Sequence, residues 1–163
     1  MRKKIIAGNW KMNNTITEAT ELVNSIKDGI NTDEVDVVLC PNFVSLSTVS
    51  DLIDETKISL GAQNVYFEDK GAYTGETSVD MLISAGVKYC IVGHSERRAY
   101  FNETDEIVNK KVKKLLEKDL TPIICVGETL EQRNEEKMFD VVKSQVINAL
   151  KDVTKDQMKR NVV

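Results

Sequence analysis

Short apolar runs alternate along this chain with longer segments in which apolar residues recur every three or four positions. The runs are rich in Val and Ile at consecutive positions, which is typical of parallel strands covered on both faces. They lie at residues 4–9, 35–41, 58–63, 89–93, 122–127 and 161–163. The pattern predicts a β-strand at each place and a sheet of parallel strands.

The segments between the runs have the spacing of amphipathic helices. Thr15 with Glu18, and Thr129 with Gln132, have the three-residue spacing of a capping box, so each pair predicts the start of a helix. The predicted apolar stripes are Ile16, Ala19, Val23, Ile26 and Ile30; Val108, Val112 and Leu115; and Phe139, Val142, Val146 and Leu150.

Alternating strands and helices, without a linker or a change of composition, predict one α/β domain over residues 1–163. Two architectures fit the alternation. An open doubly wound sheet holds about five βα units and binds a ligand where the strand order reverses. A (β/α)8 barrel needs about 250 residues, so this chain would supply roughly five of its units. Because "NVV" (161–163) begins like a strand and stops, we favour an incomplete barrel of about five βα units plus the start of the sixth strand.

Composition argues against several classes of partner. The 22 basic and 26 acidic residues are mixed along the chain and give a formal net charge of −4, which does not suit nucleic acid or an anionic membrane. No apolar run has the length of a membrane span or of a secretory signal. Cys40, Cys90 and Cys125 lie in or at the end of apolar runs, without the CxxC spacing of a metal site. We expect reduced thiols and a cytoplasmic protein.

Polar side chains follow most of the predicted strands. Because the carboxyl ends of parallel strands share one edge of a sheet, these residues should converge there. Each also has an ordinary explanation: a lone histidine is often structural, a lysine is often solvated, and a glutamate can favour a first helical turn. The sequence has no tetrahedral metal-ligand set, so we expect no metal, and it lacks a glycine-rich nucleotide motif, which weakens a nucleotide-binding role. The residues that follow the strands are Asn9, Lys11, Gln63, Asn64, His94 (the only histidine), Ser95, Glu96, Gly127 and Glu128; all but the glycine have polar side chains.

Four motifs closely resemble the triosephosphate isomerase family, in order and over the whole chain. They are "AGNWKMN" (7–13), "GAQNVYFEDKGAYTGETS" (61–78), "YCIVGHSERR" (89–98) and "PIICVGETLEQR" (122–133). The resemblance implies a TIM barrel and a cofactor-free isomerase of glycolysis and gluconeogenesis. Such an enzyme interconverts dihydroxyacetone phosphate and glyceraldehyde 3-phosphate, so its partner is a small phosphorylated triose.

The resemblance also implies roles for individual residues. Asn9 contacts the substrate, Lys11 stabilises its negative charge, and His94 polarises the carbonyl and moves protons between the two oxygens. Glu96, with Ser95 beside it, supports this arrangement. The family's histidine is kept neutral by a helix N-terminus, and "SERRAYF" could supply that helix. Thr74 reaches the active site of a second subunit, so the loop 64–78 makes a homodimer.

One departure from the family is large. In the family the catalytic carboxylate, the lid and most of the phosphate site follow the sixth strand, where this sequence stops at Val163. We therefore expect a fragment that is inactive alone and whose function belongs to an intact isomerase. The alternatives are a non-catalytic α/β association module or folding fragment and, more remotely, a doubly wound binding protein.

Overall fold

The computed structural model describes residues 3–159 and 162–163 and contains a five-stranded sheet in this part of the chain. Neighbouring strands all run parallel, and each pairs with the next in sequence, in the order β1-β2-β3-β4-β5. The strands are β1 (Lys4–Asn9), β2 (Val35–Cys40), β3 (Ile58–Ala62), β4 (Tyr89–Val92) and β5 (Thr121–Ile124).

Helices occupy most of the segments between the strands, and the two predicted capping boxes are both present, at Thr15 and at Thr129. A third capping box, at Thr154, was not predicted. The α-helices are α1 (Ile16–Ile26), α2 (Leu46–Ile53), α3 (Val79–Ser84), α4 (Ser95–Tyr100), α5 (Asp105–Glu117), α6 (Leu130–Asn134), α7 (Met138–Ala149) and α8 (Lys155–Met158). The short 3-10 helices are η1 (Lys27–Gly29) and η2 (Phe43–Ser45). None of the helices in the described ranges is long and apolar enough to cross a bilayer.

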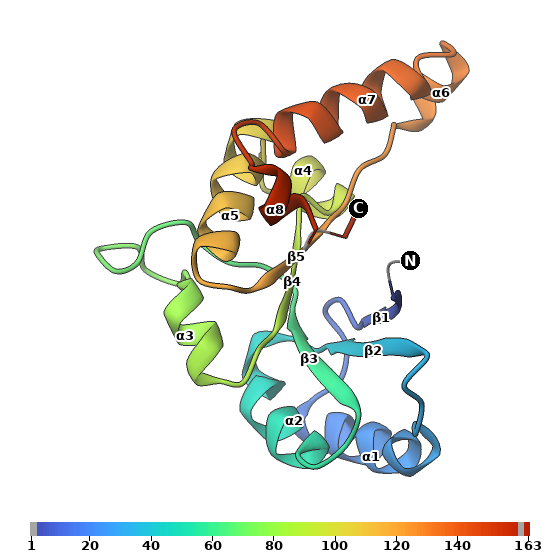
Figure 1. Ribbon diagram of the computed structural model, residues 1–163, viewed down its shortest axis with the longest axis vertical. Coiled ribbons are helices and arrows are strands. Elements are labelled where there is room, and N and C mark those ends of the chain that lie inside the picture. Colours follow the sequence, from blue (N-terminus) through green and yellow to red (C-terminus); the bar gives the residue numbers. More distant parts are fainter. Residues whose placement is uncertain (1–2, 160–161) are drawn as a thin grey trace.

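The sequential strand order decides between the two predicted architectures. A doubly wound sheet reverses direction part-way, whereas here each crossover moves the chain one strand further the same way. The result is a curled half-barrel with alternating helices, and the prediction of an incomplete (β/α)8 TIM barrel is confirmed. Figure 1 shows α1 and α2 beside β1 to β3, and α5 beside β4 and β5.

The two faces of the sheet bury different clusters. Leu60, Val92 and Ile124 belong to a large cluster shared with the helices, which includes the stripe of α5. Val38, Cys40 and Ile91 form a small second cluster. Val38 and Cys40 alternate along β2 with Leu39, which packs on the helical side, so the small cluster lies on the inner, concave face.

Close packing on the inner face explains one glycine. A Cβ atom on Gly61 would lie 2.5 Å from the Cys40 sulfur and 2.9 Å from a methyl carbon of Val38. Such separations are too short for a real side chain, so β2 and β3 pack closely at this layer only because position 61 has none.

Three sequence predictions need correction or qualification. Ile30 was placed in the stripe of the first helix, but it follows η1, because the α-helical bonding ends before Gly29. Phe139 was placed in a buried stripe, yet it is 82% exposed, and Ala149 is the buried residue of α7. Of the predicted strand 161–163, Asn161 lies outside the described residues, while Val162 makes a parallel bridge to Ile123 of β5.

Candidate active site

A cleft of about 580 Å³ lies at the carboxyl ends of the strands and brings together residues that are far apart in sequence. The predicted residues Asn9, Lys11, His94 and Glu96 all line it, and so do Gln63 and Asn64 after β3. This is the convergence that the parallel sheet predicts, because β1, β3 and β4 all end at this edge.

The main chain of Lys11 is held in an uncommon conformation. Its φ is +54°, in the left-handed region that residues with a side chain rarely adopt. Two contacts fix it: the Lys11 amide donates to Asn9 Oδ1 at 3.0 Å, and the Gln63 side-chain amide donates to the Lys11 carbonyl at 2.9 Å. Gln63 also donates to the Cys40 carbonyl at 2.9 Å, so one amide ties the loop after β1 to β2.

The ammonium of Lys11 is directed at Glu96. Its Nζ donates to Glu96 Oε1 at 2.6 Å across 85 positions of sequence. The hydrogen bond and positive charge of Lys11 lower the pKa of Glu96 below its ordinary value, against a smaller opposing effect of burial. Glu96 is therefore ionised at neutral pH, and it fixes a cation in the cleft.

The side chain of His94 caps helix α4. Its Nδ1 accepts a hydrogen bond from the Glu96 amide at 3.3 Å, and an accepting Nδ1 carries no proton. Glu96 Oε2 also lies 3.5 Å from this nitrogen, a contact that is an ion pair only if Nδ1 carries a proton. With Nδ1 as the acceptor, the ring hydrogen lies on Nε2. A donor at Nε2 can polarise a substrate oxygen that accepts its hydrogen bond.

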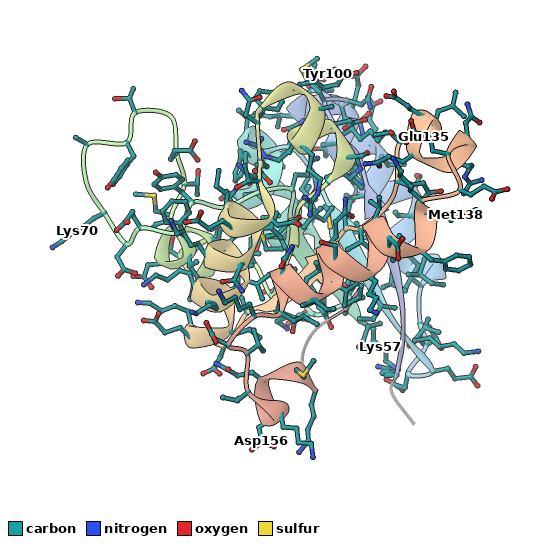
Figure 2. All side chains as sticks on the ribbon, turned by 90° about the horizontal axis from the view of Figure 1, so that it is seen from above. Lys57, Lys70, Tyr100, Glu135, Met138 and Asp156 are labelled. Atoms are coloured by element: carbon teal, nitrogen blue, oxygen red, sulfur yellow. The ribbon has the colours of Figure 1, made fainter. Side chains whose placement is uncertain are left out.

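Apolar and aromatic side chains form the outer part of the cleft, and sequence reasoning did not find them. Met12, Phe43, Tyr100 and Phe101 line the cleft and are exposed. Figure 2 shows Tyr100 at the periphery of the molecule on α4. No periodic pattern marks these residues, because they come from separate loops and from the end of a short helix.

A buried charged network lies behind the cleft and was also missed. Glu103 accepts hydrogen bonds from both Arg97 and Lys111, and Lys111 donates to Asn64 at 2.7 Å. The side chains of Glu103 and Lys111 are each only 3% exposed. Burial alone would raise the pKa of Glu103, but the hydrogen bonds from Arg97 and Lys111 bring it below its ordinary value. One signal was available: Lys111 stands three residues after Val108 and so belongs to the apolar stripe of α5.

Several predicted residues do not line the cleft. Ser95 begins α4 and is exposed. Thr74 lies in an exposed loop, and Figure 2 shows that this loop, at Lys70, projects away from the helices. Gly127 and Glu128 follow β5, but they bond to Gln145 and Arg133.

Nothing in the described part of the chain forms a group of three or more His, Cys, Asp or Glu side chains suited to a metal ion. All three cysteines are free thiols. Burial, with a smaller contribution from Cys125, raises the pKa of Cys40 to about 12, which makes that thiol a poor nucleophile. A second cleft, of about 490 Å³ between α5 and α7, is lined by side chains that bond to one another, such as Asn148 to Asp105.

Comparison with known proteins identifies the family. The family model described as triosephosphate isomerase matches residues 4–163. The chain belongs to the triosephosphate isomerase family. A protein named triosephosphate isomerase from Alkaliphilus metalliredigens (strain QYMF) is 53% identical over 163 residues, which are 100% of this chain and 66% of that protein. One from Alkaliphilus oremlandii (strain OhILAs) is 55% identical over 158 residues, or 97% and 64% of the two chains.

A third relative of the same name, from Clostridium botulinum (strain Loch Maree / Type A3), is 52% identical over 163 residues, which are 100% of this chain and 66% of that protein. The chain thus spans about two-thirds of the length of the triosephosphate isomerases that it matches. The match begins at the first strand and includes every cleft residue described above.

Proposed function

We propose that this chain supplies the electrophilic part of a triosephosphate isomerase active site. The reaction interconverts dihydroxyacetone phosphate and glyceraldehyde 3-phosphate through an enediolate. The observation that carries the proposal is the meeting of Lys11 and His94 in one cleft, with the ammonium fixed by Glu96 and the imidazole fixed by its own helix.

His94 is the proposed electrophile. With Nδ1 engaged by the Glu96 amide, the Nε2 hydrogen is free to bond the substrate carbonyl and to stabilise the negative oxygen that develops. The same nitrogen then passes its proton between adjacent oxygens of the enediolate. A general acid–base group of this kind contributes roughly 10²- to 10⁴-fold to a rate.

Lys11 and Asn9 are the proposed substrate-binding residues. The ammonium of Lys11 offsets the charge of the phosphate ester and of the enediolate, and Glu96 keeps it from turning to solvent. Asn9 already accepts from the Lys11 amide through Oδ1, which leaves its side-chain NH₂ group to face a ligand. Ser95 is proposed to support the histidine from the first turn of α4.

The assembly and location of the protein are part of the proposal. Thr74, at the exposed loop 64–78, is proposed to reach a second copy of the chain, which gives a homodimer. The residues named act without a metal or an organic cofactor, and the protein is proposed to work in the cytoplasm in glycolysis and gluconeogenesis.

A chimera tests the function directly. Residues 1–163 are joined to the C-terminal third of one of the relatives above, and triose phosphate isomerisation is followed with a coupled dehydrogenase. We expect turnover in the chimera. The matched variants His94→Gln and Lys11→Met should each lose most of it. A folded chimera without turnover, or one that works equally well without His94, would contradict the proposal.

A further inference from the structure

The side chain of Arg98 packs beside His94 without lining the cleft. Its Nε donates to the Gly93 carbonyl at 2.9 Å, and this oxygen belongs to the peptide bond that immediately precedes His94. The backbone amide of Arg98 donates to the His94 carbonyl at 3.1 Å. One residue thus bonds the main chain on both sides of the histidine.

The contact with Gly93 is close as well as hydrogen-bonded. Gly93 has φ +70°, and a Cβ atom there would lie 3.2 Å from Arg98 Nη2 and 3.2 Å from the Cys125 carbonyl. The guanidinium therefore packs over Gly93, the first of the two residues between β4 and α4. A side chain at residue 93 would displace the arginine or strain the turn.

Arg98 is itself anchored from outside the site. Its Nη1 donates to Asp105 Oδ1 at 2.6 Å, and Asn148 donates to the other oxygen of the same carboxylate at 3.0 Å. Asp105 is the first residue of α5, and Asn148 lies in α7. The Arg98 side chain is 19% exposed, so water competes little for these bonds.

We propose that Arg98 is a positioning residue that sets the orientation of the His94 imidazole, with Asp105 as its anchor. The chain of contacts runs from α7 and α5 through the guanidinium to the peptide bond of Gly93 and His94. The turn geometry then decides whether His94 Nδ1 reaches the Glu96 amide. This inference deepens the proposed function and rests on it for the catalytic role of His94, but its test observes the ring nitrogens of His94 directly.

The single histidine makes the test simple. With ¹⁵N-labelled histidine at about pH 8, the chimera described above, with any histidine of its added C-terminal third substituted, should show one protonated and one unprotonated nitrogen for His94, because one tautomer is held by the capping bond. In Arg98→Met we expect the two nitrogen signals to move toward each other as the tautomers mix. The Glu96 amide should exchange with solvent roughly tenfold faster or more, as expected when a charged hydrogen bond is lost.

Matched variants separate positioning from loss of stability. Val112→Ala removes buried volume from α5 and is a control for lost stability, so it should leave the His94 signals unchanged. If Arg98→Met does not fold, Arg98→Lys and Asp105→Asn, which conserve volume, decide the question by a smaller shift in the same direction.

Unchanged His94 signals in the folded Arg98 variants would overturn the proposal, and so would an unsubstituted chain in which the two tautomers already interchange. In the chimera, Arg98→Met should lower kcat by roughly 100-fold while changing KM little, since a misplaced catalytic group costs rate more than binding. An inactive chimera would count against the proposed function, while the NMR result would still decide the role of Arg98.

Discussion

The buried pair of Lys111 and Glu103 provides a sharp test of what holds the cleft in place. In Lys111→Met the side-chain volume is nearly conserved, but Glu103 loses one of its two cationic partners and Asn64 loses its donor. Removing one member of a buried ion pair costs about 3–5 kcal/mol. Because Arg97 still bonds Glu103, we expect the lower end, about 3 kcal/mol.

That loss is a large part of a typical free energy of unfolding, which is about 5–15 kcal/mol. With a urea dependence of about 2–3 kcal/mol per molar, the unfolding midpoint should fall by about 1–1.5 M. The measurement is urea unfolding of the chimera, followed by circular dichroism at one protein concentration.

Lys113→Met is the matched control, on the same helix. Lys113 is 49% exposed and lies 4.0 Å from Asp152, so its loss should change stability by less than about 0.5 kcal/mol. Adding Glu103→Leu to Lys111→Met should restore part of the loss, because the buried carboxylate is then gone and Arg97, which is 26% exposed, can bind water instead. If Lys111→Met lowered the midpoint no more than Lys113→Met does, the reasoning about this pair would be refuted.

Three further predictions concern acid, activity and association. The pKa of Glu103 is lower in the folded than in the unfolded chain, so its contribution to stability is present above the unfolded value of about 4.3 and is lost as the pH falls. In Glu103→Gln the free energy of unfolding should therefore fall less steeply as the solution is acidified. An unchanged decrease at acid pH would argue against this. A polypeptide of these 163 residues alone should not isomerise triose phosphate at a useful rate, because Glu96, the only carboxylate lining the described cleft, is bound to Lys11. A turnover rate within tenfold of that of the chimera, measured in the same coupled assay, would contradict this. The same polypeptide should self-associate, since Ile6 on β1 is 61% exposed at the edge of the sheet. Light scattering across a concentration series, together with hydrogen exchange of residues 4–9, measures this. A monomer with a protected first strand would show that the edge is covered and would contradict the prediction.

The strands were predictable because they are apolar at consecutive positions. The expected cover on both faces is absent at β1, where Ile6 is 61% exposed, and the predicted strand 122–127 is too long, because β5 ends at Ile124. Helix ends were predictable where a side chain forms the cap, as at Thr15. Ile30 was placed wrongly because spacing alone does not show where helical hydrogen bonding ends. Phe139 was placed wrongly because an apolar stripe does not show whether a neighbour covers it.

The site was predictable as a set of positions but not as a geometry. The shared edge of parallel strands placed Asn9, Lys11 and His94 together, and all three line the cleft. What holds them could not be read from the chain. The bond from Gln63 to the Lys11 carbonyl and the bond from Arg98 to the Gly93 carbonyl both depend on backbone atoms, which carry no signal in the sequence.

The sequential order of the strands bears on how such a chain is made. Synthesis proceeds from the N-terminus, and domains begin to fold as they emerge. Each new βα unit here meets a neighbour that was made immediately before it, so the sheet can grow one strand at a time along a single front. Lys11 must nevertheless wait for a partner 85 residues later, and until Glu96 leaves the ribosome its ammonium has only water to bind. The contact between Lys11 and Glu96 therefore cannot form before the fourth strand and the helix after it have been made.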